Sequence, residues 1–154
     1  MKAETRIFGA IEIEDEKIVT MEKGMIGFPE LKHFALIFDE EKEAKDRTIM
    51  WFQSMDDGDI AFPVIEPSLA LDDYQPEFSE EMLAVLGEMA DEDAFLLVTV
   101  TVPKEVEKLT CNLQAPIIVN MKNNKGAQVI VENDYPIKYS LAHLIKNKKE
   151  KAGE

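Results

Sequence analysis

Short apolar strands separated by closely spaced turns run through most of this chain, and this pattern constrains the fold more than any other feature. The strongest strand pattern covers residues 94–102, AFLLVTVTV, and ends at Pro103. Residues 117–119 and 128–131 form a hairpin pattern around the turn at 123–126. Many short strands with a single convincing helix predict a mainly β fold, an antiparallel β-barrel-like single domain with one or two short helices. A β-sandwich is the alternative arrangement.

Two other segments carry clear patterns. Residues 6–14 and 17–21 alternate apolar and polar side chains, and the acidic pair at 15–16 predicts a hairpin turn between them. A helix is predicted to begin after Ser79, which can cap it. Its apolar side is formed by Phe78, Met82, Leu83, Leu86 and Met89. We expect residues 1–140 to form the barrel domain and residues 141–154 to form a short helix and a lysine-rich tail.

The same alternation predicts which side chains form the core. On one strand either Trp51 or the pair Met50 and Phe52 must face inward, because neighbouring side chains point to opposite faces. We predict that Trp51 does, with Gln53 as its inward neighbour near the strand end. The predicted core is Ile11, Ile13, Val19, Leu36, Trp51, Val64, Leu97, Val100, Ile118 and Val129.

Charge is distributed unevenly along the chain. Among 154 residues, 17 Lys and Arg stand against 31 Asp and Glu, for a net charge of −14. No basic residue lies between Arg47 and Lys104, whereas this span holds the acids Asp56, Asp57, Asp59, Glu66, Asp72, Asp73, Glu77, Glu80, Glu81, Glu88, Asp91, Glu92 and Asp93. Such a field repels phosphate backbones and attracts basic partners. We therefore expect no direct binding of nucleic acid, and a basic partner is the alternative to a surface that is acidic only for solubility.

Catalytic and metal-binding patterns are missing from the sequence. The cluster Asp56, Asp57 and Asp59 around Gly58 lacks the ligand spacing of a calcium loop and is typical of a turn between two strands. The two histidines, His33 and His143, and the single cysteine are scattered, whereas zinc sites need clustered Cys and His ligands. No nucleophile elbow, P-loop or dinucleotide fingerprint occurs. We expect no enzyme activity, no cofactor and no metal.

Location follows from two further observations. Cys111 is the only cysteine, so it cannot form an internal disulfide, and it is expected to be a small buried residue in a protein of the reducing cytoplasm. The longest apolar run is too short to cross a bilayer, so no membrane contact is expected. Two other functions stay open from these residues alone: a ligand-binding barrel of the lipocalin type, and a hydrolase that uses an unrecognised carboxylate pair.

Five motifs, taken in order, resemble the FliW family of flagellar assembly factors. They are GMIGFPEL at 24–31, WFQSMDDGDIAFPVIEP at 51–67, LLVTVTVP at 96–103, NLQAPIIVN at 112–120 and DYPIKY at 134–139. Each motif alone is ordinary strand-and-turn sequence, but five in register are specific. The resemblance runs from near the N-terminus to about Tyr139.

The resemblance implies a compact, non-enzymatic regulator of the bacterial cytoplasm. Proteins of this family bind flagellin and also CsrA, a small basic RNA-binding dimer that represses translation of the flagellin messenger. When flagellin is exported, the freed factor captures CsrA and relieves repression. No short signature transfers site residues to this chain, so the predicted partner contacts are the exposed parts of the matching motifs. They are Phe28, Asp56, Asp57, Asp59, Glu66, Asp72, Asp73 and Tyr74, of which Phe28 and Glu66 have core packing and strand-end decoration as alternatives.

Overall fold

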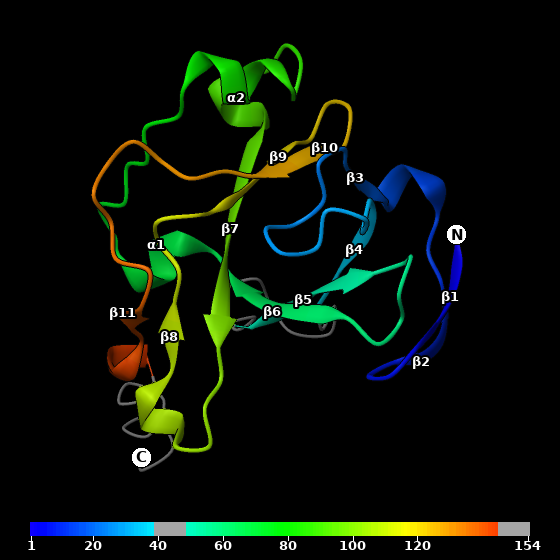
Figure 1. Cartoon of the computed structure of the whole chain (residues 1–154), viewed down its shortest axis with the longest axis horizontal. Helices are drawn as coiled ribbons and strands as arrows, with labels where there is room; N and C mark the ends of the chain where they lie inside the picture. Colours follow the sequence, from blue (N-terminus) through cyan, green and yellow to red (C-terminus); the bar gives the residue numbers. More distant parts are fainter. Residues whose placement is uncertain (39–48, 145–154) are drawn as a thin grey trace.

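A closed barrel of seven strands forms the centre of the molecule (Figure 1). The computed structural model describes residues 1–38 and 49–144. The barrel strands are β3 (Val19–Met21), β4 (His33–Ile37), β5 (Met50–Ser54), β6 (Ala61–Ile65), β7 (Ala94–Thr101), β9 (Ile117–Asn120) and β10 (Lys125–Gln128). They follow one another around the barrel in the order β7-β6-β5-β4-β3-β10-β9, and pairing of β9 with β7 closes the ring. The predicted β-barrel fold is confirmed.

Barrel closure depends on one parallel pair. All other neighbouring strands of the barrel are antiparallel, but β3 and β10 run parallel, with Thr20 opposite Lys125 and Met21 opposite Gly126. At Gly126 a Cβ atom would lie 2.7 Å from the Met21 sulfur and 2.9 Å from Val19 Cγ1, so a larger residue would require these two side chains to shift.

Strand β7 changes partners along its length. Its first half, residues 94–97, pairs with β9, and its end pairs with β8 (Thr110–Cys111), which in turn pairs with β11 (Tyr139–Ser140). Residues 112–116 connect β8 to β9, and their carbonyl groups accept hydrogen bonds from Val129 N–H and Val131 N–H.

Large side chains fill the barrel interior. Phe34 and Phe52 are fully buried there, and their rings stack with centroids 4.5 Å apart. The remaining interior residues come from successive strands and from the loop after β3: Val19, Met21, Met25, Leu31, Met50, Val64, Leu97, Ile117 and Val119. A filled interior is what a structural barrel needs, whereas a barrel of the lipocalin type needs a hollow one.

The predicted core is largely confirmed, with one error. Buried as predicted are Val19, Val64, Leu97, Val100, Ile118 and Val129, whereas Ile11, Ile13 and Leu36 are half-buried. The prediction that Trp51 faces the barrel interior is wrong. Met50 and Phe52 face inward, with 6% and 0% of their surface exposed, and Trp51 is half-buried on the outside of the barrel.

An N-terminal hairpin explains how Trp51 can lie outside. Strands β1 (Lys2–Thr5) and β2 (Gly9–Glu12) form a separate two-stranded sheet that packs on the outer side of β4 and β5 (Figure 1). The ring of Phe8, in the hairpin turn, meets the ring of Trp51 edge-on at 6.5 Å. The hairpin therefore covers part of Trp51, which is half-buried on the outer side of β5.

The hairpin turn lies at residues 6–8, not at 15–16 as predicted. Thr5 fixes the turn, since its hydroxyl accepts a hydrogen bond from Phe8 N–H at 2.9 Å and donates one to Gly9 O at 2.8 Å. Gly9 has φ of 68°, a conformation that favours glycine. The acidic pair instead belongs to a 3-10 turn, η1 (Asp15–Lys17), which leads into β3.

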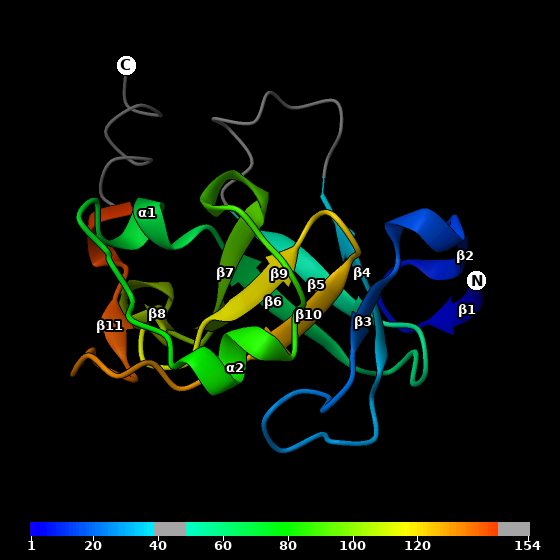
Figure 2. The ribbon, with the colours of Figure 1, turned by 90° about the horizontal axis from the view of Figure 1, so that it is seen from above.

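Short helices cover the remaining outer surfaces. α1 (Pro67–Ala70) follows β6, and α2 (Glu80–Ala84) lies beside β9 and β10 (Figure 2). Ser79 caps α2 as predicted, because its hydroxyl accepts a hydrogen bond from Met82 N–H at 3.3 Å. The predicted apolar side of this segment, which includes the buried Leu86, packs against Ile118 and Val129. Two further 3-10 turns are η3 (Asp91–Asp93) and η4 (Val106–Lys108).

The C-terminal prediction is only partly within the described residues. The prediction of a short helix and a lysine-rich tail covers residues 141–154, of which 142–144 are helical and 145–154 lie outside the described residues. The charged sequence DEEKEAKDR at 39–47 also lies outside them. Within residues 1–38 and 49–144, no helix combines the length and the apolar character needed to cross a membrane.

Candidate functional site

The predicted contact acids form two groups at opposite ends of β6 (Figure 1). Asp56, Asp57 and Asp59 lie in the turn between β5 and β6, whereas Glu66, Asp72 and Asp73 lie around α1, beyond the other end of the strand. Asp59 and Glu66, the members of the two groups that lie nearest along the chain, are seven residues apart, which is roughly 23 Å of extended backbone at about 3.3 Å per residue. The structure therefore does not bring the acids together into one cluster.

The acidic cluster at residues 56–59 is a turn, as predicted. The Ser54 hydroxyl accepts hydrogen bonds from Asp56 N–H at 3.2 Å and from Asp57 N–H at 3.0 Å. The Asp57 carboxylate accepts one from Asp59 N–H at 3.0 Å. Short polar side chains that bond nearby backbone groups are typical of turns. These hydrogen bonds hold the backbone of the turn, and the side chains of Asp57 and Asp59 are exposed to solvent.

Asp56 differs from its neighbours because it joins the turn to β4. Its carboxylate accepts hydrogen bonds from Lys32 N–H at 2.7 Å and His33 N–H at 2.8 Å, and lies 3.0 Å from His33 Nδ1. Burial alone would raise the pKa of the Asp56 carboxyl, but the hydrogen bonds from His33 and Lys32 outweigh it and hold the pKa below 3.8. Asp56 is thus a structural acid as well as a predicted contact.

The β5–β6 turn also holds the N-terminal hairpin. Arg6 N–H donates to Gly58 O at 3.0 Å, and a Cβ atom at Gly58 would overlap the Glu4 carbonyl oxygen. The fully buried Gln53 supports the turn from below, since its amide nitrogen lies within hydrogen-bonding distance of the carbonyl oxygens of Ser54, Gly58 and Ile60. Glycine at position 58 therefore allows the hairpin to contact the turn directly.

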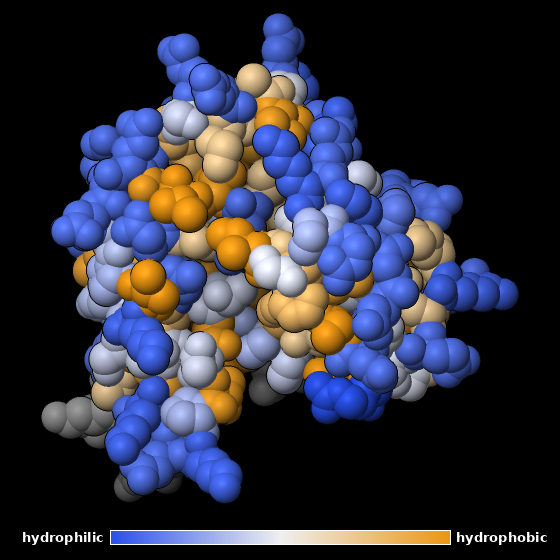
Figure 3. Space-filling model, viewed as in Figure 1, coloured by the Kyte–Doolittle hydropathy of each residue, from blue (hydrophilic) through white to orange (hydrophobic). Residues whose placement is uncertain are grey.

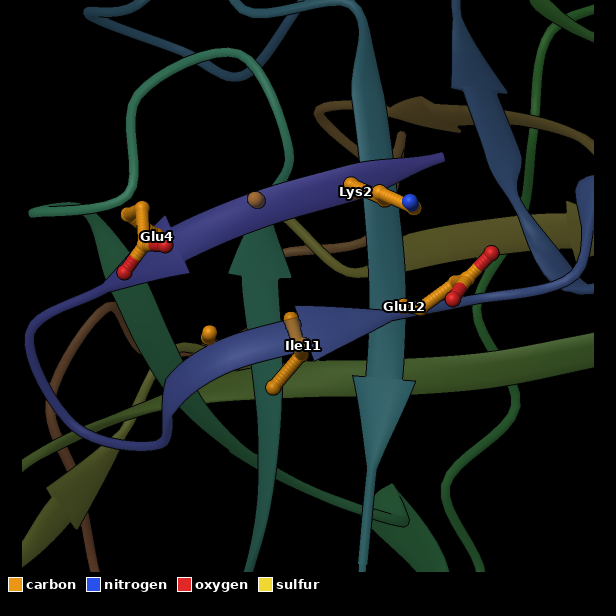
Figure 4. Close-up of a pocket in the computed structure, with 6 residues that line it drawn as sticks. Lys2, Glu4, Ile11 and Glu12 are labelled. Atoms are coloured by element: carbon orange, nitrogen blue, oxygen red, sulfur yellow. The ribbon is translucent and has the colours of Figure 1, made fainter.

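A shallow recess lies on this hairpin (Figure 4). Lys2 stands opposite Glu12 across the two strands, and Glu4 stands opposite Ala10. The recess is lined by these four residues together with Ala3 and Ile11, so it is shaped by one hairpin alone. Its mixed charge gives no recognisable chemistry.

The acids around α1 are freely accessible, but Tyr74 is not. Glu66, Asp72 and Asp73 are exposed, and none of them takes part in an ion pair within the described part of the chain. The Tyr74 hydroxyl donates to Leu113 O at 2.6 Å, and its ring lies 4.7 Å from that of Tyr135. Burial raises the pKa of the Tyr74 hydroxyl. Tyr74 therefore packs the segment after α1 against Leu113 and Tyr135.

Phe28 has a packing role too. It is half-buried in the loop between β3 and β4, and its ring meets Phe62 edge-on with centroids 5.5 Å apart. The packing alternative for this residue is therefore observed. Of the predicted contacts, five side chains stay fully available to a partner: Asp57, Asp59, Glu66, Asp72 and Asp73.

His33, His143 and Cys111 each have a different environment. His33 contacts Asp56, whereas His143 Nε2 lies 3.2 Å from Leu69 O. Cys111 is buried as predicted, and burial raises the pKa of its thiol to about 12, which keeps it protonated. Among residues 1–38 and 49–144, no three His, Cys, Asp or Glu side chains are grouped so that they could hold a metal ion.

Sequence reasoning missed a set of exposed isoleucines. Ile26, Ile130 and Ile137 have 55%, 62% and 65% of their surface exposed. Alternation patterns do not mark them, because they lie in loops or just beyond a strand. The available signal was their position: Ile26 and Ile137 fall within the motifs at 24–31 and 134–139.

Comparison with known proteins gives one consistent result. The family model described as "FliW protein" matches residues 2–141. The flagellar assembly factor FliW of Lachnoclostridium phytofermentans is 38% identical over 148 residues, which cover 96% of this chain and 94% of the relative. The protein of the same name from Thermotoga maritima is 40% identical over 145 residues, which cover 94% and 93% of the two chains.

A solved structure agrees with the sequence relatives. The crystal structure of a flagellar assembly factor FliW superposes with a TM-score of 0.81 at 32% identity, covering 92% of this chain and 96% of the other. The family model, the sequence relatives and the solved structure agree over nearly the whole chain, and the chain belongs to the FliW family of flagellar assembly factors.

Proposed function

We propose that this chain is a non-enzymatic cytoplasmic assembly factor that binds flagellin and the translational regulator CsrA, and so antagonises CsrA repression of flagellin translation. Family membership supports the flagellar role. The observation that carries the CsrA part is the exposed, unpaired acidity at both ends of β6.

These acids suit a basic partner for a physical reason. Asp57 and Asp59 at one end, and Asp72 and Asp73 at the other, take part in no ion pair within the described residues. With a net charge of −14, the molecule has a negative field that attracts a basic protein over about one Debye length, roughly 8 Å in physiological salt. The field accelerates encounter, and the local carboxylates then set orientation.

The separation of the two acidic groups fits one interface. A standard protein interface buries about 800 Å² on each partner, which corresponds to a patch roughly 30 Å across. The roughly 23 Å between Asp59 and Glu66 is shorter than the width of such a patch. In this proposal Asp57, Asp59, Glu66, Asp72 and Asp73 contact CsrA directly, whereas Asp56, Tyr74 and Phe28 hold the contacting segments in place.

Two experiments test the proposal. The tagged chain, used as bait in a lysate of flagellated cells, should recover flagellin and CsrA, identified by mass spectrometry. Purified chain should also displace CsrA from a fluorescent flagellin leader RNA, and added flagellin should reverse the displacement. If neither protein is recovered, and purified chain leaves the CsrA–RNA complex intact, the proposal is wrong.

A further inference from the structure

One aspartate of this chain is followed by glycine, and the pair lies in the turn between β5 and β6. Asp57 and Gly58 form the only Asp-Gly pair of the sequence, which contains no Asn-Gly pair. Asp57 is exposed to solvent. In Figure 3, hydrophilic residues cover most of the side on which Figure 1 places this turn. Because glycine has no side chain, its peptide nitrogen is unhindered and can react with the neighbouring carboxyl group.

The turn holds the Asp57 carboxyl group close to the peptide bond that follows it. One carboxylate oxygen of Asp57 accepts a hydrogen bond from Asp59 N–H at 3.0 Å. A hydrogen bond from an aspartate side chain to the backbone two residues on folds the side chain back along the main chain. The Gly58 nitrogen lies within the loop that this hydrogen bond closes. The carboxyl carbon and the nitrogen that can attack it are therefore held near each other in the folded protein.

The hydrogen bonds of the turn leave the Gly58 nitrogen without an acceptor. Asp57 N–H donates to the Ser54 hydroxyl at 3.0 Å, and Ile60 N–H donates to Asp57 O at 3.0 Å. Gly58 takes part through its carbonyl oxygen, which accepts from Arg6 N–H at 3.0 Å. Within residues 1–38 and 49–144, Gly58 N–H donates to no acceptor. Attack by this nitrogen therefore breaks no hydrogen bond that it makes.

We propose that Asp57 is a site of spontaneous isomerisation to isoaspartate in the folded protein. The Gly58 nitrogen forms a bond to the carbon of the protonated Asp57 carboxyl group, the nitrogen loses its proton, and the carboxyl C–OH bond breaks. One water molecule leaves, and a five-membered succinimide ring remains. One water molecule then opens the ring. Opening at the side-chain carbonyl restores aspartate, whereas opening at the backbone carbonyl leaves the chain linked through Cγ, as isoaspartate. This proposal does not rest on binding of flagellin or CsrA.

The same reaction is hindered at the two other aspartates of this turn. The carboxylate of Asp56 is held by two backbone N–H groups at the start of β4, and the next residue, Asp57, carries a side chain. Asp59 is followed by Ile60, whose branched side chain crowds the peptide nitrogen. Asp59 is as exposed as Asp57 in class and lies in the same turn, so it serves as an internal control.

Isomerisation changes the turn that holds the N-terminal hairpin. The main chain gains one carbon atom between Asp57 and Gly58, and the carboxylate is then attached to Cα. Gly58 has little room to move, because even a Cβ atom there would overlap the Glu4 carbonyl oxygen. We therefore expect isoaspartate to break the hydrogen bond from Arg6 N–H to Gly58 O and to loosen the hairpin.

The test incubates the purified, folded chain at neutral pH and physiological temperature. Isoaspartate is measured with the repair methyltransferase, which transfers a labelled methyl group from S-adenosylmethionine to the isoaspartate carboxyl group. Mass spectrometry of peptides then locates the modified residue. We expect isoaspartate at Asp57 and none at Asp59. The matched control Asp57→Glu keeps the charge but would need a six-membered ring, so methyl acceptance should be lost.

A second measurement follows the hairpin. Limited proteolysis should cut residues 1–12 faster after incubation of the wild-type chain, with no change for Asp57→Glu. If Asp57→Glu does not fold, Asp57→Ser replaces it as the control. Isoaspartate that forms only in urea-unfolded chain, that forms equally at Asp59, or that persists in the control variant would overturn the proposal.

Discussion

Replacing Asp56 should reveal how much one turn acid contributes to the barrel. The carboxylate accepts two backbone hydrogen bonds, from Lys32 at 2.7 Å and from His33 at 2.8 Å, and a third contact to the His33 ring at 3.0 Å. The side chain keeps 30% of its surface exposed, so each contact is worth less than a buried charged hydrogen bond. If each of the three contacts contributes about 0.7 kcal/mol, Asp56→Ala should lower the free energy of unfolding by roughly 2 kcal/mol.

The isosteric variant separates hydrogen bonding from charge. In Asp56→Asn the amide oxygen can keep both backbone hydrogen bonds, so the free energy of unfolding should fall by less than about 1 kcal/mol. Asp57→Ala is the matched control, because its carboxylate makes one local contact, with Asp59 N–H. We expect Asp57→Ala to lower the free energy of unfolding by no more than about 0.5 kcal/mol.

The Asp56 effect should also depend on pH. The pKa of this carboxyl is held below 3.8 in the folded protein, so its contribution is complete above the pKa of the unfolded chain and is lost as pH falls through the folded value. The difference between wild type and Asp56→Ala, measured by urea unfolding, should therefore be full at pH 7 and shrink below about pH 4. Equal unfolding free energies for Asp56→Ala and Asp57→Ala at pH 7 would refute this reasoning.

Three further predictions concern stability and reactivity. Gly58→Ala should lower the thermal midpoint by several degrees, because its methyl group would overlap the Glu4 carbonyl oxygen, and limited proteolysis should then cut the N-terminal hairpin first; unchanged proteolysis would contradict this. The thiol of Cys111, with a pKa raised to about 12, should resist a disulfide reagent at pH 8 in the folded protein and react in urea; fast native reaction would show that the burial is wrong. Ser79→Ala should cost about 1 kcal/mol of unfolding free energy by loss of the hydrogen bond to Met82 N–H, and an unchanged value would deny the cap a role.

Local patterns were enough to predict the barrel class and the capped helix. Strand alternation, turn residues and a serine cap act between residues close in sequence. The closing contact is different, because β3 and β10 pair in parallel although more than a hundred residues separate Thr20 from its partner Lys125. Such a pairing depends on which strand edges are left unpaired after the rest of the sheet forms, and no local signal encodes it.

The error at Trp51 has a physical cause. Alternation divides a strand into two faces but does not say which one points inward. Here both faces of β5 are covered, one by the barrel interior and the other by the N-terminal hairpin, so Phe52 and Gln53 are both fully buried. The orientation of β5 that buries two apolar side chains, Met50 and Phe52, in the barrel interior is more favourable than the one that buries Trp51 there. Trp51 then packs against the N-terminal hairpin.

The candidate site was predictable in composition but not in arrangement. The acids stand out in sequence because no lysine or arginine interrupts them between Arg47 and Lys104. Their distribution to two ends of β6 and the structural role of Asp56 needed the fold, since adjacent aspartates in a turn point in different directions. Sequence reasoning about acidity therefore predicts a kind of partner, and the structure decides which acids are free to meet it.

The most direct test of the CsrA proposal is the rate of association with CsrA as a function of ionic strength. Two triple variants raise the net charge equally: Asp57→Lys, Asp59→Lys and Asp73→Lys at the two ends of β6, and Glu88→Lys, Asp91→Lys and Glu92→Lys near η3. Wild type should associate more slowly as salt rises, because salt screens the attraction. The first variant should lose more than about ten-fold in rate at low salt while the second loses much less, with equal thermal midpoints as the folding control. A folded first variant that binds CsrA at the wild-type rate would contradict the proposal that these acids meet CsrA.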